Sequence, residues 1–172
     1  NKQSDNFIIL LCSFVPQRPP VLSDPDWAEI YRLSQAHNLT PAVYEAAYGL
    51  PAFAEASSET AELFMTTALG QSGAQFIRTE ALLTVYEKLL AGGVRPLVLK
   101  GLVCRSLYPR PDLRLSCDED LWIPKEAVLS CDRILRENGY AAEDQVLLDH
   151  LDSVIDTAQE LTYASDILTL EM

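Results

Sequence analysis

Apolar residues in the first half of the chain recur every three to four positions, which is the spacing of amphipathic helices. This spacing predicts helices over residues 4–14, 26–37, 40–48 and 57–90. The last and longest of these contains Gly70 and Gly73, which would kink the helix or split it in two. We therefore predict a helical N-terminal region over residues 1–92.

Short apolar runs replace the helical pattern after residue 92. We predict, in chain order, a strand over residues 96–99, a turn at Lys100-Gly101, a short helix over 102–107, a strand over 116–123, a helix over 124–138, an acidic surface segment over 143–156 and two strands within 161–172. This mixture predicts an α+β class, with a sheet-containing core over residues 93–172.

Two carboxylates share one face of the strand predicted over residues 116–123. Side chains alternate along a strand, so Asp118, Asp120 and Trp122 lie on one face and Glu119 is the polar exception on the other. Like charges this close repel, and one stays protonated unless a cation lies between them. Hard divalent cations such as Mg²⁺ bind carboxylate oxygens and keep positions open for phosphate. The pattern fits a Mg²⁺ site or a solvated strand edge, and we expect Trp122 to pack against other side chains.

Basic residues gather around the predicted turn, in a chain with only 13 Lys and Arg. A helix N-terminus offers free N–H groups and partial positive charge to anions, and glycine lets a phosphate approach the backbone. Lys100 and Gly101 are therefore candidate nucleotide-binding residues. Arg114 is a candidate phosphate or substrate contact, or else pairs with a surface carboxylate. The basic cluster consists of Arg95, Lys100, Arg105, Arg110 and Arg114.

The stretch LVLKGLVCRSLYPRPDLRLSCDEDLWIPKEAVLSCDRILRENGY resembles the uncharacterised nucleotidyltransferase family of the polymerase-β-like superfamily. The shared pattern is LKG, then LYP-x-P-x-LR, a D-x-D-L strand and a helix that ends in GY. The upstream segment AHNLTPAVYEAA is similar to the family's helical N-terminal region. The resemblance implies a polymerase-β-like nucleotidyltransferase core, with a small mixed sheet and flanking helices. It also implies a divalent metal, Mg²⁺ or Mn²⁺, and a nucleoside triphosphate.

The resemblance also implies a third carboxylate from a neighbouring strand. Leu170-Glu171-Met172 matches the start of the family segment that carries it, so the implied catalytic and metal-binding set is Asp118, Asp120 and Glu171. The alternative is that Glu171 is an exposed C-terminal glutamate. Because the matching segment breaks off there, we expect a C-terminal part of the core to be missing. Glu119 replaces a residue that is usually apolar in the family, and we expect it to face water at the sheet edge or to disturb the site electrostatically.

The implied activity moves a nucleoside monophosphate from an NTP to a hydroxyl acceptor. The net charge of −12 disfavours broad binding to nucleic acid, so we expect a small-molecule or protein acceptor. One alternative is a catalytically degenerate domain that binds a nucleotide or a protein partner, and another is a purely structural domain. His37 and His150 have no partnering Ser or Cys nucleophile motif, which argues against a hydrolase triad.

The four cysteines have irregular spacing that matches no zinc signature. Cys104 and Cys117 fall at apolar positions, and we expect them to be core thiols in a reducing compartment. The apolar run over residues 7–14 is too short to cross a bilayer. We therefore expect a cytoplasmic protein with no membrane partner, and the sequence indicates no particular oligomeric state.

Overall fold

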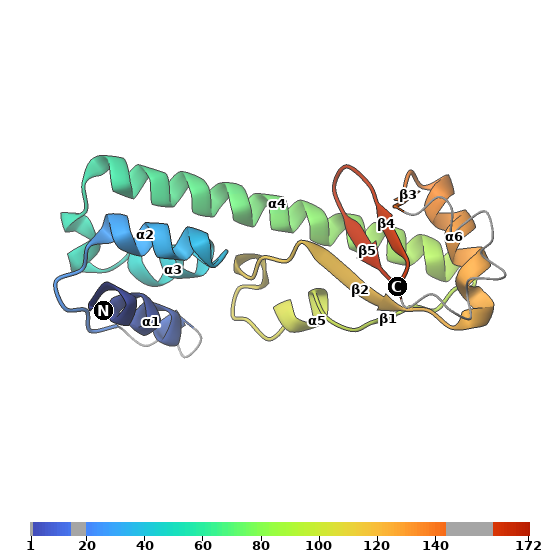
Figure 1. The fold of residues 1–172 in the computed structure, drawn as a ribbon, viewed down its shortest axis with the longest axis horizontal. Coiled ribbons are helices and arrows are strands. Elements are labelled where there is room, and N and C mark those ends of the chain that lie inside the picture. Colours follow the sequence, from blue (N-terminus) through green and yellow to red (C-terminus); the bar gives the residue numbers. More distant parts are fainter. Residues whose placement is uncertain (1, 15–19, 144–159) are drawn as a thin grey trace. The chain divides into compact units, whose positions relative to one another are not determined.

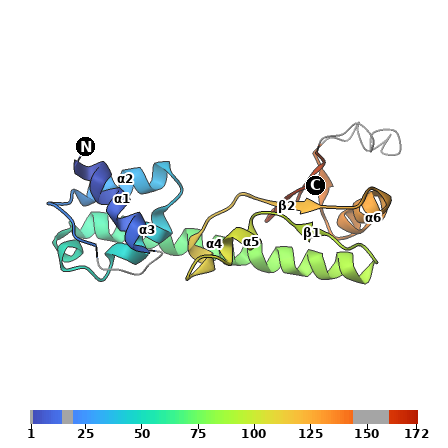
Figure 2. The ribbon, with the colours of Figure 1, turned by 90° about the horizontal axis from the view of Figure 1, so that it is seen from below.

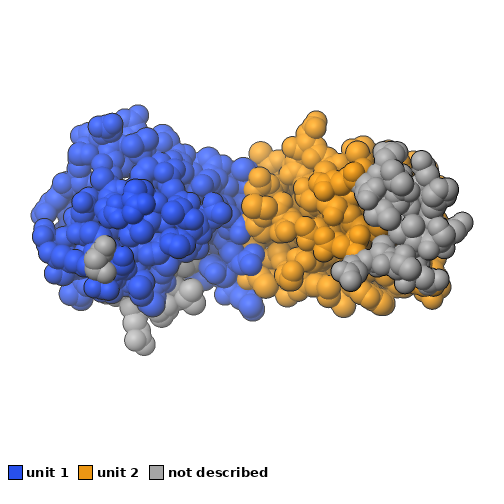
Figure 3. All heavy atoms as spheres, in the orientation of Figure 1, with its two compact units in different colours: residues 1–75, 107–115 blue, residues 76–106, 116–172 orange. Residues whose placement is uncertain are grey.

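The computed structural model describes residues 2–14, 20–143 and 160–172. It forms two compact units, coloured separately in Figure 3. Unit 1 contains residues 1–75 and 107–115, and unit 2 contains residues 76–106 and 116–172. Helix α4 (Ser58–Ala91) therefore supplies its first part to unit 1 and its second part to unit 2. The boundary between residues 92 and 93 stays a prediction.

Unit 1 is built from helices (Figure 1). They are α1 (Lys2–Phe14), α2 (Trp27–Ala36), α3 (Thr40–Ala47), the first part of α4, and the short 3-10 helices η1 (Pro51–Glu55) and η2 (Pro111–Leu113). Aromatic side chains fill the core: the ring centroids of Trp27 and Phe53 are 4.9 Å apart, and those of Phe53 and Phe64 are 5.8 Å apart. The predicted helices are confirmed, and α4 is continuous through its two glycines, so the predicted split is wrong.

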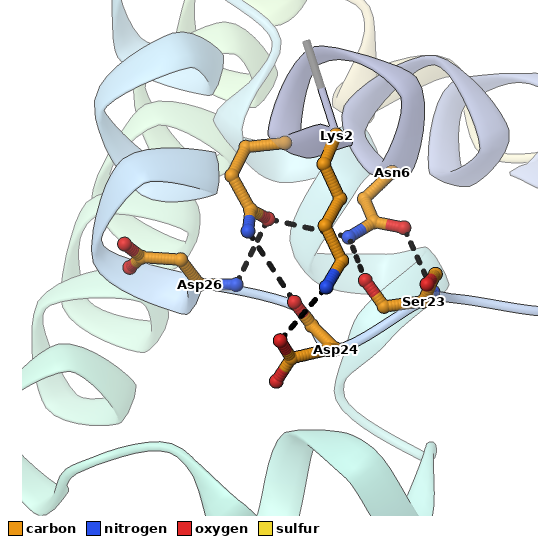
Figure 4. Close-up of polar contacts among 6 residues, drawn as sticks. Lys2, Asn6, Ser23, Asp24 and Asp26 are labelled. Carbon is orange, nitrogen blue, oxygen red and sulfur yellow. Dashed lines mark hydrogen bonds and ion pairs between the residues drawn. The ribbon is translucent and has the colours of Figure 1, made fainter.

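Polar contacts fasten the start of α1 to the segment that leads into α2 (Figure 4). The buried Asn6 side chain donates to the Ser23 carbonyl and accepts from the Ser23 N–H, each at 3.0 Å. Lys2 pairs with Asp24 at 2.8 Å. Asp26 then caps α2, because its side chain accepts from two free N–H groups in the first turn of the helix.

Unit 2 contains a five-stranded mixed sheet in the order β1-β2-β5-β4-β3. The strands are β1 (Leu97–Val98), β2 (Asp118–Trp122), β3 (Ala141–Ala142), β4 (Thr162–Ala164) and β5 (Thr169–Glu171). Strands β2 and β5 are parallel, and the other pairs are antiparallel. The chain is therefore α+β, as predicted, with N-terminal helices followed by a mixed sheet with helices.

Helices cover one face of this sheet. Figure 2 shows β1 and β2 running alongside the second part of α4, with α6 (Val128–Glu137) nearby. Leu121, Tyr163 and Leu170 point from the strands into this buried core. The helical side of the core consists of Leu82, Val85, Leu89, Cys131, Ile134 and Leu135. Because side chains alternate along a strand, the neighbouring residues of β2 and β5 face away from these helices.

Several smaller expectations are corrected. Helix α5 spans only Leu102–Arg105, preceded by the Lys100-Gly101 turn. Cys117 is exposed rather than part of the core, whereas Cys104 is half-buried. The buried thiol is that of Cys131, whose pKa is raised to about 12 by burial and by the nearby charge of Asp132.

Most of the acidic segment predicted over 143–156 lies outside the described residues. Within the described part of the chain, no helix has both the length and the apolar character needed to cross a bilayer.

Candidate active site

The parallel pairing of β2 with β5 brings the three predicted acids together. In this register Asp118 lies opposite Thr169, and Asp120 lies opposite Glu171. Residues that are paired across two strands share a face, as do alternate residues along one strand. Asp118, Asp120 and Glu171 therefore occupy one face of the sheet, away from the helices of the core.

Lys100 supplies a positive charge to these acids. Its Nζ lies 2.7 Å from Oδ1 of Asp120. The hydrogen bond to Asp120 and the charge of that carboxylate raise the pKa of Lys100, with smaller contributions from Asp118 and Glu171. The pKa of the Glu171 carboxyl is also raised, first by burial and then by the negative charges of Asp118, Glu160 and Asp120. The three acids and Lys100 thus form one electrostatic cluster.

Glu119 points to the other side of β2, into the protein. The side chains of Glu119 and Arg105 are each 1% exposed, and Nη1 of Arg105 lies 2.5 Å from Oε1 of Glu119. The Glu119 carboxylate also accepts from the Leu102 N–H at 2.8 Å and from Ser116 Oγ at 3.2 Å. The expectation that Glu119 faces water is wrong, because these three donors satisfy its charge inside the fold.

Gly101 is required by this arrangement. Its φ is +51°, a backbone conformation that residues with a Cβ rarely adopt. A Cβ added at this position would lie 1.9 Å from Oε2 of Glu119. The N–H of the next residue, Leu102, is already bonded to Glu119. The structure therefore explains Gly101 by its close approach to a carboxylate of the protein, and phosphate binding by this residue stays a prediction.

Arg105 and Arg110 of the predicted basic cluster have carboxylate partners other than the three acids. Arg105 pairs with Glu119, and Arg110 pairs with Glu45 at 2.9 Å within unit 1. Arg114 follows η2 in unit 1, whereas the acids belong to unit 2. Its role as a phosphate or substrate contact stays a prediction.

Trp122 differs from the expectation that it packs inside the protein. It lies on the same strand face as Asp120 and is 54% exposed. Leu97, its partner on β1, is 58% exposed. The open face of the sheet therefore carries apolar surface beside the acids.

The Arg105–Glu119 pair was not predicted from the sequence, although one signal was present. A glutamate at a position where the neighbouring pattern is buried needs a positive partner inside the protein. The sequence offered several arginines nearby and nothing that selected Arg105 among them.

The acids provide the oxygen ligands that a hard divalent cation prefers. The pKa of Glu171 is raised first by burial and then by the neighbouring carboxylates, and a bound cation would relieve the second of these effects. In the described part of the chain, however, no group of three or more His, Cys, Asp or Glu side chains is arranged to hold a metal ion. The Lys100 ammonium forms an ion pair with Asp120 instead. The residues fit such a cation in chemistry and in strand face, but their side chains are not arranged to hold it.

The chain belongs to the uncharacterised nucleotidyltransferase family, whose model matches residues 23–172. This match spans the sheet, the three acids and the Lys100-Gly101 turn, and it confirms the resemblance seen in the sequence. No curated protein and no solved structure matches the chain. The family match therefore defines the class of protein and does not identify a substrate.

Proposed function

We propose that this protein is a metal-dependent nucleotidyltransferase that moves a nucleoside monophosphate from an NTP to a hydroxyl acceptor. The observation that carries the proposal is the placement of Asp118, Asp120 and Glu171 on one face of two paired strands, in a chain of this family. The net charge of −12 favours a small-molecule or protein acceptor over nucleic acid.

The three carboxylates bind the divalent cation, Mg²⁺ or Mn²⁺. When bound, such a cation stabilises negative charge on the entering and leaving oxygens at phosphorus. The acceptor hydroxyl oxygen bonds to the α-phosphorus and gives up its proton to water, and the bond to the departing pyrophosphate breaks. Asp118, Asp120 and Glu171 would hold the cation, which would supply positive charge to the reacting phosphate.

Lys100 binds the β- and γ-phosphates together with the backbone N–H of Gly101. The Lys100 side chain is 70% exposed, so water screens its charge, although the Asp120 side chain is only 18% exposed. Its contact with Asp120 can therefore be exchanged for a contact with the triphosphate at small cost. Lys100 then neutralises phosphate charge while the acids hold the cation.

A second candidate function is a degenerate domain that binds nucleotide without turnover. Two observations favour it: Lys100 is already paired with Asp120, and the Leu102 N–H is already bonded to Glu119. Both reduce the groups that are free to hold a triphosphate. The experiment must therefore separate binding from catalysis.

Thermal unfolding with Mg²⁺ or Mn²⁺ and each NTP tests binding. We expect the wild-type Tm to rise by about 5–10 °C when Mg²⁺·NTP is about 100-fold above its Kd. The Asp118→Ala/Asp120→Ala variant should lose this rise. Glu80→Ala/Glu87→Ala removes the same charge from exposed positions on α4 and should keep it. No rise in the wild type with any NTP would overturn the proposal.

Pyrophosphate release with candidate acceptors then tests turnover. Release that depends on the acceptor and on Asp118 supports the transferase. Binding without release, for every class of hydroxyl acceptor, supports the degenerate domain.

A further inference from the structure

We propose that the buried Arg105–Glu119 pair is a positioning device that holds the Lys100-Gly101 turn and thereby directs the Lys100 ammonium to the acids. The role of this device in catalysis rests on the proposed function. The placement of Lys100 itself does not, because the contact with Asp120 is present in the ligand-free protein.

Glu119 connects the acid-bearing strand to the turn. It lies between Asp118 and Asp120 on β2, with its side chain on the opposite face. Its carboxylate accepts from Arg105 at the end of α5 and from the Leu102 N–H at the start of α5. A single side chain on β2 therefore fixes both ends of the four-residue helix that follows Lys100.

Lys100 is anchored to β2 on both sides. On one side, the Leu99 N–H donates to the Asp120 carbonyl at 2.9 Å. On the other, the Leu102 N–H donates to Glu119 Oε2 at 2.8 Å. Between them, Gly101 approaches Glu119 so closely that a Cβ would lie 1.9 Å from the same oxygen. The backbone of Lys100 is thus held against the strand that carries Asp118 and Asp120.

Stability alone does not explain the pair. Replacing a buried ion pair with apolar residues of similar volume is often neutral or stabilising. The pair is also incompletely satisfied: Nε and Nη2 of Arg105 are buried with no hydrogen-bond partner among the described residues. An apolar contact would fill the same space without these unpaired groups. What it would not supply is the acceptor for the Leu102 N–H, which is the contact that holds the turn.

The test replaces the pair with apolar residues and follows Lys100. In the Arg105→Met/Glu119→Leu variant, we expect a folded protein, because the apolar contact offsets the loss of the ion pair. The NMR chemical shifts of Lys100 Cε and Nζ should move toward the values that they have in Asp120→Asn, because the ammonium is no longer paired with Asp120. The control variant Asp132→Asn/Arg136→Gln removes another ion pair of unit 2 and should leave the Lys100 signals unchanged.

Ligand binding provides the second readout. We expect the apolar variant to bind Mg²⁺·NTP about 10- to 100-fold more weakly than wild type, as for residues that orient a metal ligand. In a Lys100→Ala background, the same double substitution should weaken binding no further, because the pair acts through Lys100. An equal loss in both backgrounds would contradict the proposal.

The outcomes separate this inference from the proposed function. Unmoved Lys100 signals in a folded apolar variant overturn the positioning role, whatever the ligand binding shows. If the Lys100 signals move in the apolar variant but the wild type binds no NTP, the positioning role stands and the proposed transferase activity is overturned. If the apolar variant does not fold, Glu119→Met removes the acceptor of the Leu102 N–H and keeps a side chain of similar length. The Lys100 signals must then move in that variant, and their staying in place overturns the proposal.

Discussion

Glu171 faces Asp120 directly across the pairing of β2 and β5, and its carboxyl pKa is raised by burial and by neighbouring negative charge. A raised pKa means that the folded state holds this proton more tightly than the unfolded state does. Stability is therefore lost as the pH rises from the ordinary value of 4.5 through the raised pKa. At neutral pH, the ionised Glu171 costs the protein stability.

Glu171→Gln should remove this cost. We expect its Tm at pH 7 to exceed that of wild type by about 1–4 °C, with a smaller decline of Tm between pH 4 and pH 7. Thermal unfolding at several pH values, without metal, measures both effects. Glu126→Gln, at an exposed position, should leave the profile unchanged. A lower Tm in Glu171→Gln at pH 7 would show that the carboxylate makes a favourable contact in the ligand-free protein.

At the residue scale, the sequence predicted the site in part. The two-residue period of a strand was enough to place Asp118 and Asp120 on one face, because that geometry is local. The partner of Glu119 was not predictable, because Arg105 lies 14 positions away and only the packing of α5 on β2 selects it. The exposure of Trp122 likewise depends on how the neighbouring strand covers it.

At the element scale, Gly101 forms the turn that leads from β1 into α5. An alanine there would need an unfavourable φ and would place its Cβ against the Glu119 carboxylate. We expect Gly101→Ala to destabilise the protein by about 2–5 kcal/mol, as the sum of backbone strain and overpacking. Urea unfolding measures the change, with an unchanged m-value showing that the unfolding reaction is the same.

Gly139→Ala is the matched control for this prediction. Gly139 also has a positive φ, of +85°, but nothing lies within 4 Å of an added Cβ. Only the backbone cost should appear, about 1–2 kcal/mol. If the two variants lose the same stability, Glu119 yields easily and does not fix the turn.

The elements themselves were predicted unevenly. The long helices carry their period over many residues, so α4 was placed within one residue at each end. The strands are short, and β1 has only two residues where four were predicted. Such strands are defined by pairing with distant partners, and this information is absent from a local pattern. The start of α5 was predicted as an anion site because the sequence could not show that Glu119 already binds there.

At the scale of the whole molecule, the two largest hydrophobic clusters of the described residues lie in different units. Helix α4 contributes Phe64 to the first and Leu82, Val85 and Leu89 to the second. Phe64 is fully buried, whereas Phe76 on the same helix is 53% exposed. We expect Phe64→Ala to destabilise the protein by about 3–5 kcal/mol, and Phe76→Ala by less than about 1 kcal/mol.

Urea unfolding of both variants measures these changes. A large loss in Phe76→Ala would show that this side chain is covered in solution. The α+β class of the whole molecule was predictable, because a change from helical to strand spacing is visible along the sequence. The membership of residues 107–115 in unit 1 was not, because only three-dimensional contacts reveal it.

That membership has a consequence for biosynthesis. Leu113 is buried against Ala42 in unit 1, although residues 76–106 of unit 2 separate this segment from the rest of the unit. A ribosome must therefore translate past residue 115 before the N-terminal helices meet their last partner, and by then β1 and α5 have already been made. A fragment of residues 1–75 therefore lacks the segment that completes unit 1, and a cut within α4 after residue 75 leaves residues 107–115 on the same fragment as unit 2.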